Sequence, residues 1–176
     1  MNATFQEIAV KERYRAAAIK PESALCCPID YDTRLLAVIP QEVIDKDYGC
    51  GDPSRCLRPG ETVLDLGSGA GKICFIAAQI VGPKGQVIGV DMTDEMLAVA
   101  RRNAPIVAER LGYSNVRFLK GRIQDLALDL ERLDRELNQK PITDAAWFLA
   151  VGALAEELRV TLPLIPSASI DVVISN

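Results

Sequence analysis

The sequence predicts an α/β fold built on a parallel sheet with helices on both faces. Two observations lead to this class: short apolar runs with strand character alternate with helical stretches, and one such run passes through a glycine-rich turn directly into a helix. Strands joined by helices cross over to parallel neighbours, which places the helices against the sheet. We expect strands at residues 62–66, 87–90, 116–119 and 170–174, with helices at 71–81 and 94–111.

The glycine-rich turn after the first strand is the most informative segment. Asp65 lies at the end of an apolar strand, and Gly67, Gly69 and Gly71 follow at every second position, with Ser68 inside the turn. Glycine accepts positive φ and has no Cβ, so a ligand can lie against this backbone where the next helix begins. The spacing differs from the dinucleotide-binding fingerprint, and an acid here attracts a protonated amine rather than a pyrophosphate. The alternative is a plain tight turn.

A second acid lies at the end of the second strand. Asp91 follows a short β-branched run about 20 residues after the glycine turn, where nucleotide-binding units place an acceptor for ribose hydroxyls. Met92, the next residue, is expected to pack on the adenine face. Asp91 is also a candidate N-cap for the following helix, as are Thr93 and Asp94, and the two roles are compatible.

Composition narrows the class of protein. The chain has 176 residues, which suggests one domain, and a net charge of −4, which argues against nucleic-acid or anionic-membrane partners. We expect no transmembrane segment and no signal peptide, hence a cytoplasmic protein with reduced thiols. Histidine is absent, so this chain offers no histidine acid–base chemistry and no histidine metal site, and we expect no metal.

The remaining segments suggest an N-terminal cap and a helical insert. Residues 3–19 have helical character, and residues 39–44 are expected to open a short helix with proline near its start. Leucines at helical spacing predict a helix at 125–137, and a second apolar stripe predicts another at 144–158. Both are expected to be covering helices. We therefore divide the chain into a cysteine-bearing cap (1–56) and a nucleotide-binding domain (57–176) with an insert at about 125–169.

The acidic-x-Gly-x-Gly-x-Gly pattern resembles the cofactor loop of class I S-adenosylmethionine-dependent methyltransferases, and several separated segments resemble the arsenite-methylating family more narrowly. The Cys26-Cys27 pair and the Tyr-Gly-Cys-Gly run around Cys50 are the most specific of them. The segments that carry the resemblance are Val10–Tyr14, Ala24–Cys27, Asp47–Gly51, Val63–Gly71, Val87–Thr93 and Asp171–Asn176.

This resemblance implies a Rossmann-like class I methyltransferase fold and S-adenosylmethionine as cofactor. Asp65 and Gly67 would face its methionine part, Asp91 its ribose, and the residues after the third strand its adenine. Many class I enzymes have Asp where Arg122 stands, so we expect a backbone contact from Ile123 instead. The cofactor-binding residues implied are Asp65, Gly67, Ser68, Gly69, Gly71, Asp91, Met92, Arg122, Ile123 and Asn176.

The resemblance also implies a thiol site for the methyl acceptor. Trivalent arsenic is a soft centre and thiolate is the matching soft ligand. Cys50 with Cys26 or Cys27 is the expected set of catalytic thiols, which would hold the arsenic facing the cofactor methyl group. Cys56 and Cys74 are expected to be small buried apolar residues.

The chain stops at Asn176, where the family continues with further strands and another cysteine. We therefore expect an incomplete chain that lacks the C-terminal strands and is inactive alone, with an apolar edge at the fourth strand that invites self-association. Three alternatives remain: a methyltransferase acting on another small molecule, a dinucleotide-dependent oxidoreductase, and a non-catalytic nucleotide-binding fragment.

Overall fold

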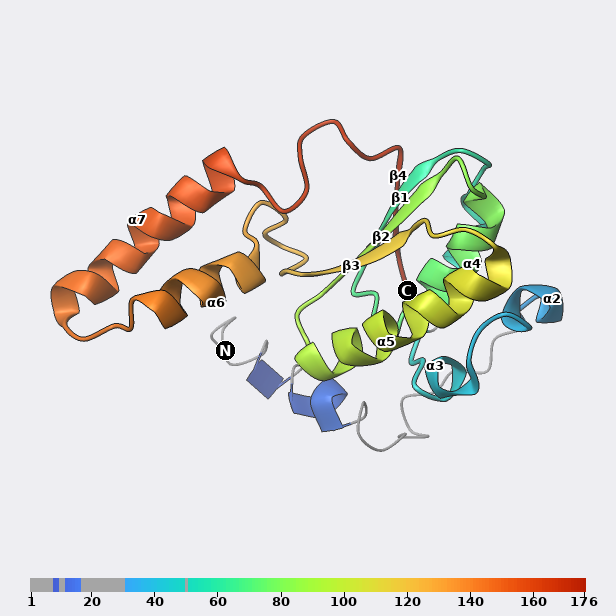
Figure 1. The fold of residues 1–176 in the computed structure, drawn as a ribbon, viewed down its shortest axis with the longest axis horizontal. Helices are drawn as coiled ribbons and strands as arrows, with labels where there is room; N and C mark the ends of the chain where they lie inside the picture. Colours follow the sequence, from blue (N-terminus) through green and yellow to red (C-terminus); the bar gives the residue numbers. More distant parts are fainter. Residues whose placement is uncertain (1–7, 10–11, 17–30, 50) are drawn as a thin grey trace.

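The computed structural model describes residues 8–9, 12–16, 31–49 and 51–176. Its centre is a four-stranded parallel sheet with the order β3-β2-β1-β4 (Figure 1). The strands are β1 (Thr62–Leu66), β2 (Gln86–Asp91), β3 (Val116–Lys120) and β4 (Val172–Ser175). All four predicted strands are confirmed. The fourth begins at Val172 instead of residue 170, and the preceding Asp171 accepts a hydrogen bond from the Thr62 amide (2.8 Å).

Two helices pack on one face of this sheet. Helix α4 (Lys72–Val81) follows β1, and α5 (Asp94–Leu111) follows β2, as predicted. Gly82 and Gly112 end them with positive φ. The main apolar core lies between these helices and the sheet, where Phe75 meets Phe118 of β3 edge to face at 5.6 Å between ring centroids. The face that carries α4 and α5 is thus the best-packed part of the described chain.

Irregular segments line the opposite face. Leu64, Ile88 and Val90 of the sheet form a second cluster there with Leu164. Partly buried neighbours of that cluster, Leu126 and Ile170 among them, come from the segments on either side of the helical insert. The two chain segments are joined by backbone hydrogen bonds, including one from the Leu164 amide to the Ala127 carbonyl (3.0 Å).

The insert forms a helical hairpin that extends beyond the β3 edge (Figure 1). It consists of α6 (Leu130–Gln139) and α7 (Ala145–Thr161), whose N-terminal amides bond to the capping carboxylates of Asp129 and Asp144. The prediction that the first of these helices begins at residue 125 was wrong, because Asp125 pairs with Arg122 in a bridge and Asp129 caps a helix that begins at Leu130. These helices meet each other through a small leucine cluster instead of covering the sheet.

The N-terminal part of the described chain lies beside the first face. Residues 12–16 are helical, which agrees with part of the helix predicted at 3–19, and the rest of that range lies outside the described residues. Short helices follow at α2 (Thr33–Leu36), α3 (Gln41–Asp45) and η2 (Pro53–Cys56). Pro40 precedes α3, as the sequence predicted.

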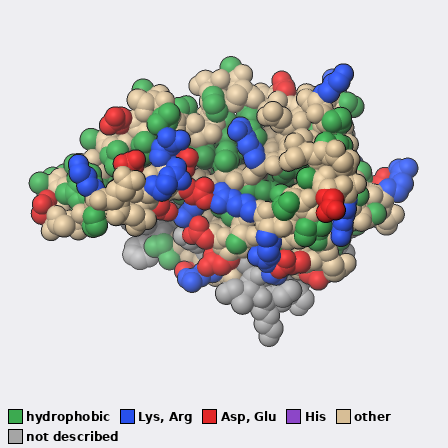
Figure 2. All heavy atoms as spheres, viewed as in Figure 1, with side chains coloured by type: hydrophobic (Ala, Val, Ile, Leu, Met, Phe, Trp, Pro, Cys, Tyr) green, Lys and Arg blue, Asp and Glu red, His purple; other side chains and the backbone are tan. Residues whose placement is uncertain are grey.

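The surface mixes charges of both signs. Figure 2 shows Lys and Arg side chains lying among Asp and Glu side chains on the face in view. Three of the ion pairs tie the hairpin to its surroundings, namely Arg101–Glu131, Lys120–Asp134 and Arg159–Asp125. Strand β4 lies at one edge of the sheet with Val173 exposed, and self-association there stays a prediction.

Candidate functional site

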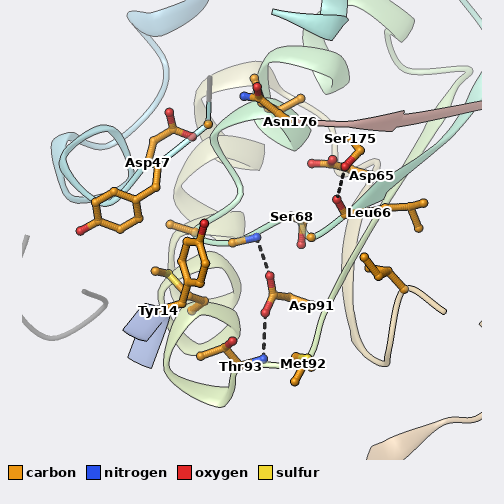
Figure 3. Close-up of a pocket in the computed structure, with 18 of the residues that line it drawn as sticks. Tyr14, Asp47, Asp65, Leu66, Ser68, Asp91, Met92, Thr93, Ser175 and Asn176 are labelled. Atoms are coloured by element: carbon orange, nitrogen blue, oxygen red, sulfur yellow. Dashed lines mark hydrogen bonds between the residues drawn. The ribbon is translucent and has the colours of Figure 1, made fainter. Parts of the chain in front are cut away.

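A cavity of about 280 Å³ opens at the C-terminal ends of β1 and β2. Ligands of open parallel sheets bind at this edge, where loops and helix N-termini converge. One wall comes from the glycine turn and the other from the segment after α3 (Figure 3). The predicted residues that line it are Asp65, Gly67, Ser68, Gly69, Asp91, Met92, Ile123 and Asn176.

The glycine turn forms the first wall of this cavity. Gly67 and Gly69 have φ values of 76° and 53°, and a Cβ at either position would meet no atom within 4 Å. The amides of Gly67 and Ser68 are held by the Val90 carbonyl of β2 (2.8 and 3.1 Å). Gly71 differs, since it does not line the cavity and a Cβ there would lie 2.6 Å from the Phe118 ring. Its glycine is needed for packing and for its φ of 92°.

Asp91 braces the same turn. Its Oδ2 accepts a hydrogen bond from the Gly69 amide (3.0 Å) and its Oδ1 accepts one from the Thr93 amide (2.8 Å), as Figure 3 shows. The second bond goes to the amide of Thr93, which is itself the N-cap residue of α5, so Asp91 is not the N-cap and Thr93 holds that position without a capping bond from its side chain. A carboxylate offers about four acceptor positions, so these two bonds leave capacity for a diol. Asp91 thus fixes the turn and still presents acceptors to the cavity.

Asp65 is the most deeply buried acid of the cavity, with 2% of its surface exposed. Burial raises its pKa to about 6, with smaller contributions in the same direction from the negative charges of Asp91 and Asp47. The Cys74 thiol donates a hydrogen bond to its Oδ2 (3.2 Å) and opposes that rise. Such a site favours a cationic ligand, which would restore the charged carboxylate.

The residues after β3 are only partly at the cavity. Gly121 and Ile123 line it, and the Gly121 amide bonds to the Asp91 carbonyl (3.0 Å). Arg122 does not line the cavity and forms a backbone bridge with Asp125. The expected adenine contact from Ile123 therefore stays a prediction, on a residue that the structure brings to the site.

Sequence reasoning missed a buried ion pair behind the second wall. Lys72, at the first turn of α4, pairs with Asp47 and also lies over the Tyr31 ring at 3.8 Å from its centroid. Burial raises the pKa of Asp47, although the ammonium group of Lys72 opposes this. The ion pair joins the N-terminal segment to the glycine turn. Its sequence signal was a lysine directly after the last glycine.

Asn176 connects β4 to the loop that contains the Tyr-Gly-Cys-Gly run. Its Oδ1 accepts a hydrogen bond from the Gly51 amide, and Tyr31 donates to the Gly51 carbonyl (2.8 Å). A Cβ on Gly49 would lie 1.9 Å from the Asn176 Nδ2, so a larger residue there would displace the Asn176 amide. The two glycines of the run thus allow close approach of the Asn176 amide. Tyr48 and Tyr14 complete this wall, with their rings edge to face and 6.2 Å between the ring centroids.

The cysteine predictions have mixed outcomes. Cys26, Cys27 and Cys50 lie outside the described residues. The prediction for Cys56 was wrong, because it is exposed at the end of η2. Cys74 is buried as predicted, but it is more than an apolar filler, since its thiol bonds to Asp65.

The described residues contain neither a metal-binding cluster of acids and thiols nor a membrane-spanning helix. No group of three or more Cys, Asp or Glu side chains in that part of the chain is placed to hold a metal ion. No helix within it is both long and apolar enough to cross a bilayer.

Comparisons with known proteins agree with this geometry. A methyltransferase domain family matches residues 57–160. Arsenite methyltransferase of Aquipseudomonas alcaligenes is 50% identical over 93 residues, which cover 53% of this chain and 27% of that protein. The Halobacterium salinarum arsenite methyltransferase is 56% identical over 84 residues, 47% of this chain and 20% of that protein. The chain thus spans about a quarter of the length of these relatives.

A solved structure extends the likeness to the fold. The crystal structure of an arsenic (III) S-adenosylmethionine methyltransferase from Chlamydomonas reinhardtii has 41% sequence identity and a TM-score of 0.50. The match covers 62% of this chain and 35% of that one. With the family match over more than half of its length, the chain belongs to the methyltransferase domain family and has the Rossmann-like fold of class I S-adenosylmethionine-dependent methyltransferases.

Proposed function

We propose that this chain binds S-adenosylmethionine and is the cofactor-binding part of an enzyme that methylates trivalent arsenic held by cysteine thiolates. One observation carries the cofactor assignment: two acids, Asp65 and Asp91, flank an open glycine turn in one cavity. Asp65 faces the methionine ammonium and Asp91 the ribose hydroxyls. The Gly67 to Gly69 backbone leaves room for the ligand to lie against it.

The reaction needs mainly proximity and alignment. Methyl transfer is an in-line displacement at carbon, in which the acceptor lone pair forms the new bond as the sulfonium sulfur leaves with its electrons. The cavity holds the cofactor on the glycine turn, and its second wall comes from the segment that precedes Cys50. Cys50 with Cys26 or Cys27 would supply the soft thiolate ligands for arsenic. The sequence identity of 50% and 56% with parts of two arsenite methyltransferases supports this choice of acceptor.

Substitution of Asp91 tests the cofactor site. Asp91→Ala should weaken S-adenosylmethionine binding by about 1–3 kcal/mol in calorimetry, since ribose hydroxyls would lose their acceptor. Asp94→Ala is the matched control, because Asp94 is largely exposed, pairs with Lys120 and lies outside the cavity. Unchanged affinity in Asp91→Ala would refute the ribose assignment. A melting temperature raised by NAD but not by S-adenosylmethionine would favour an oxidoreductase instead.

Substitution of Cys50 tests the arsenic acceptor. Trivalent arsenic should bind the wild-type chain more tightly than Cys50→Ser, because a hydroxyl is a hard and poorly ionised ligand. Cys56→Ser is the control, since that thiol is exposed at the end of η2. Equal arsenic affinity in wild type and Cys50→Ser would remove the arsenic proposal and leave a methyltransferase of another small molecule.

A further inference from the structure

The contact between Cys74 and Asp65 joins a buried thiol to the cofactor cavity. Cys74 is wholly buried in the first turns of α4, and Asp65 lies on the adjacent strand β1 with 2% exposure. The sulfur lies 3.2 Å from Oδ2 of the carboxylate, within hydrogen-bond distance. A core cysteine ordinarily packs as a small hydrophobic residue with a weak donor. Here the donor is directed at an acid that lines the cavity.

The environment of Asp65 disfavours its charged form, so a hydrogen-bond donor to this carboxylate matters for its charge. Burial is the largest cause that raises its pKa, and the neighbouring acids add to it. The thiol donor acts in the opposite direction, because a hydrogen bond to a carboxylate favours its charged form. Lys72 is paired with Asp47. The other titratable side chains around the cavity are Asp91 at the end of β2, Lys46, Asp47 and Tyr48 after α3, and Tyr14.

We propose that Cys74 is a positioning residue for cofactor binding, whose thiol holds Asp65 as an oriented carboxylate toward the ammonium group of the ligand. The bond to Oδ2 fixes the rotation of the carboxylate and leaves Oδ1 to meet the ligand in the cavity. Because α4 is buried along most of its length, the donor cannot swing away. This inference rests on the proposed binding of S-adenosylmethionine and adds a residue outside the cavity lining.

The expected signature is a change in the pH dependence of binding. Protonated Asp65 does not attract an ammonium group, so affinity should fall about ten-fold for each pH unit below the pKa of Asp65. The α-amino group of the ligand stays protonated throughout that acidic range. Loss of the thiol donor in Cys74→Ala should raise the pKa of Asp65 and move this fall to higher pH. Cys74→Ser keeps a donor and should restore the wild-type profile.

The test is calorimetric binding of S-adenosylmethionine from roughly pH 5 to roughly pH 8, a range that spans the pKa of Asp65. Cys74→Ala should bind about ten-fold more weakly than wild type near the acidic end and within about three-fold of it at the alkaline end, where Asp65 is ionised in both proteins. A merely structural role of Cys74 would weaken binding equally at every pH, and that result would overturn the proposal.

Two controls separate this inference from the proposed function. 5′-Methylthioadenosine has the adenine and ribose but no amino group, so its affinity should be the same in Cys74→Ala and wild type at each pH. Cys56→Ala removes an exposed thiol and should leave the profile unchanged. If S-adenosylmethionine does not bind the wild-type chain, the proposed function fails. If S-adenosylmethionine binds and the pH dependence of its affinity is the same in wild type and Cys74→Ala, only the proposed role of Cys74 fails.

A spectroscopic measurement avoids dependence on the stability of Cys74→Ala. Subtracting the infrared spectrum of Cys74→Ser from that of wild type isolates the S–H stretching band of Cys74. This band should lie at lower frequency than that of a thiol without a hydrogen bond. Acidification through the pKa of Asp65 should move it back as the carboxylate becomes neutral. A band at the free-thiol position that does not respond to pH would overturn the proposal.

Discussion

Helices α4 and α7 have similar apolar sequences but very different surroundings. Eight of the ten residues of α4 are buried, whereas only Ala155 and Leu158 are buried among the 17 residues of α7. The first helix packs directly on the sheet beside α5, while the second extends from the molecule in the hairpin (Figure 1). Hydrophobic composition alone therefore does not say which helix is in the core. The position in the chain does: α4 directly follows β1, whereas α7 belongs to the insert.

The same difference separates the part of the chain that forms the cavity from the insert. Helix α4 begins at the glycine turn, contributes Ile73 to the cavity and directs Cys74 at Asp65. The hairpin lines no part of the cavity and is held to the rest of the molecule by ion pairs such as Arg159–Asp125 (2.9 Å). Changes to α4 should thus affect stability and binding together, and changes to α7 should affect neither strongly.

The largest expected effect comes from Phe75 of α4. Phe75→Ala should lower the free energy of unfolding by about 3–5 kcal/mol, because it removes a wholly buried ring that packs on Phe118 and leaves a cavity. Urea denaturation followed by circular dichroism measures this. Phe148→Ala is the matched change in α7, where the ring is 66% exposed, and should cost no more than about 0.5 kcal/mol. Equal costs at the two positions would contradict the comparison.

The α4 side of the fold was predictable because its signals are local. Gly82 and Gly112 end helices, and alternation of strand and helix identifies parallel crossovers. The hairpin was harder to predict, since leucine spacing marks a helix without saying what the helix packs against. Its first helix begins later than predicted because Asp129 caps it. The segment contains several acids that could cap a helix, so the sequence does not single out Asp129.

The candidate site divides in the same way. Asp65, Gly67 and Asp91 were recognised because strand ends and a glycine turn bring them together within 30 residues of sequence. The pairing of Lys72 with Asp47 and the packing of Asn176 on Gly49 depend on contacts between distant segments. The hydrophobic periodicity of the sequence does not predict contacts of this kind. The donor role of Cys74 was missed for another reason, since a cysteine inside an apolar helix has the same pattern as an alanine.

Asp65 should carry the second-largest effect, and with the opposite sign to Phe75. Its folded pKa is about 6 because of burial, above the ordinary value of 3.8, so the folded state binds the proton more tightly than the unfolded state. Its contribution to stability is complete below the unfolded pKa and is lost as pH rises from about 4 to about 6. Asp65→Asn should therefore stabilise the unliganded chain at neutral pH by about 1–3 kcal/mol while weakening cofactor binding.

Asp125 beside the hairpin supplies the contrasting acid. The guanidinium of Arg159 holds the pKa of Asp125 below its ordinary value, so its contribution to stability is present above that value and lost on acidification. Asp125→Asn should thus destabilise at neutral pH and lose its effect in acid. Unfolding free energies measured against pH for both variants give the two signs, and the same sign in both would contradict these assignments.

The smallest expected effect lies in α7 itself. Gly152 is exposed inside this helix, and a Cβ there would meet no atom within 4 Å. Gly152→Ala should therefore stabilise the chain by about 0.5–1 kcal/mol, because alanine restricts the unfolded chain and favours helix. The same change at the start of α4, Gly71→Ala, should destabilise, since φ is 92° and the new Cβ would lie 2.6 Å from Phe118. Thermal denaturation of the two variants measures both. A loss of stability in Gly152→Ala would mean that this side of α7 packs closely against another surface, which would end the contrast with α4.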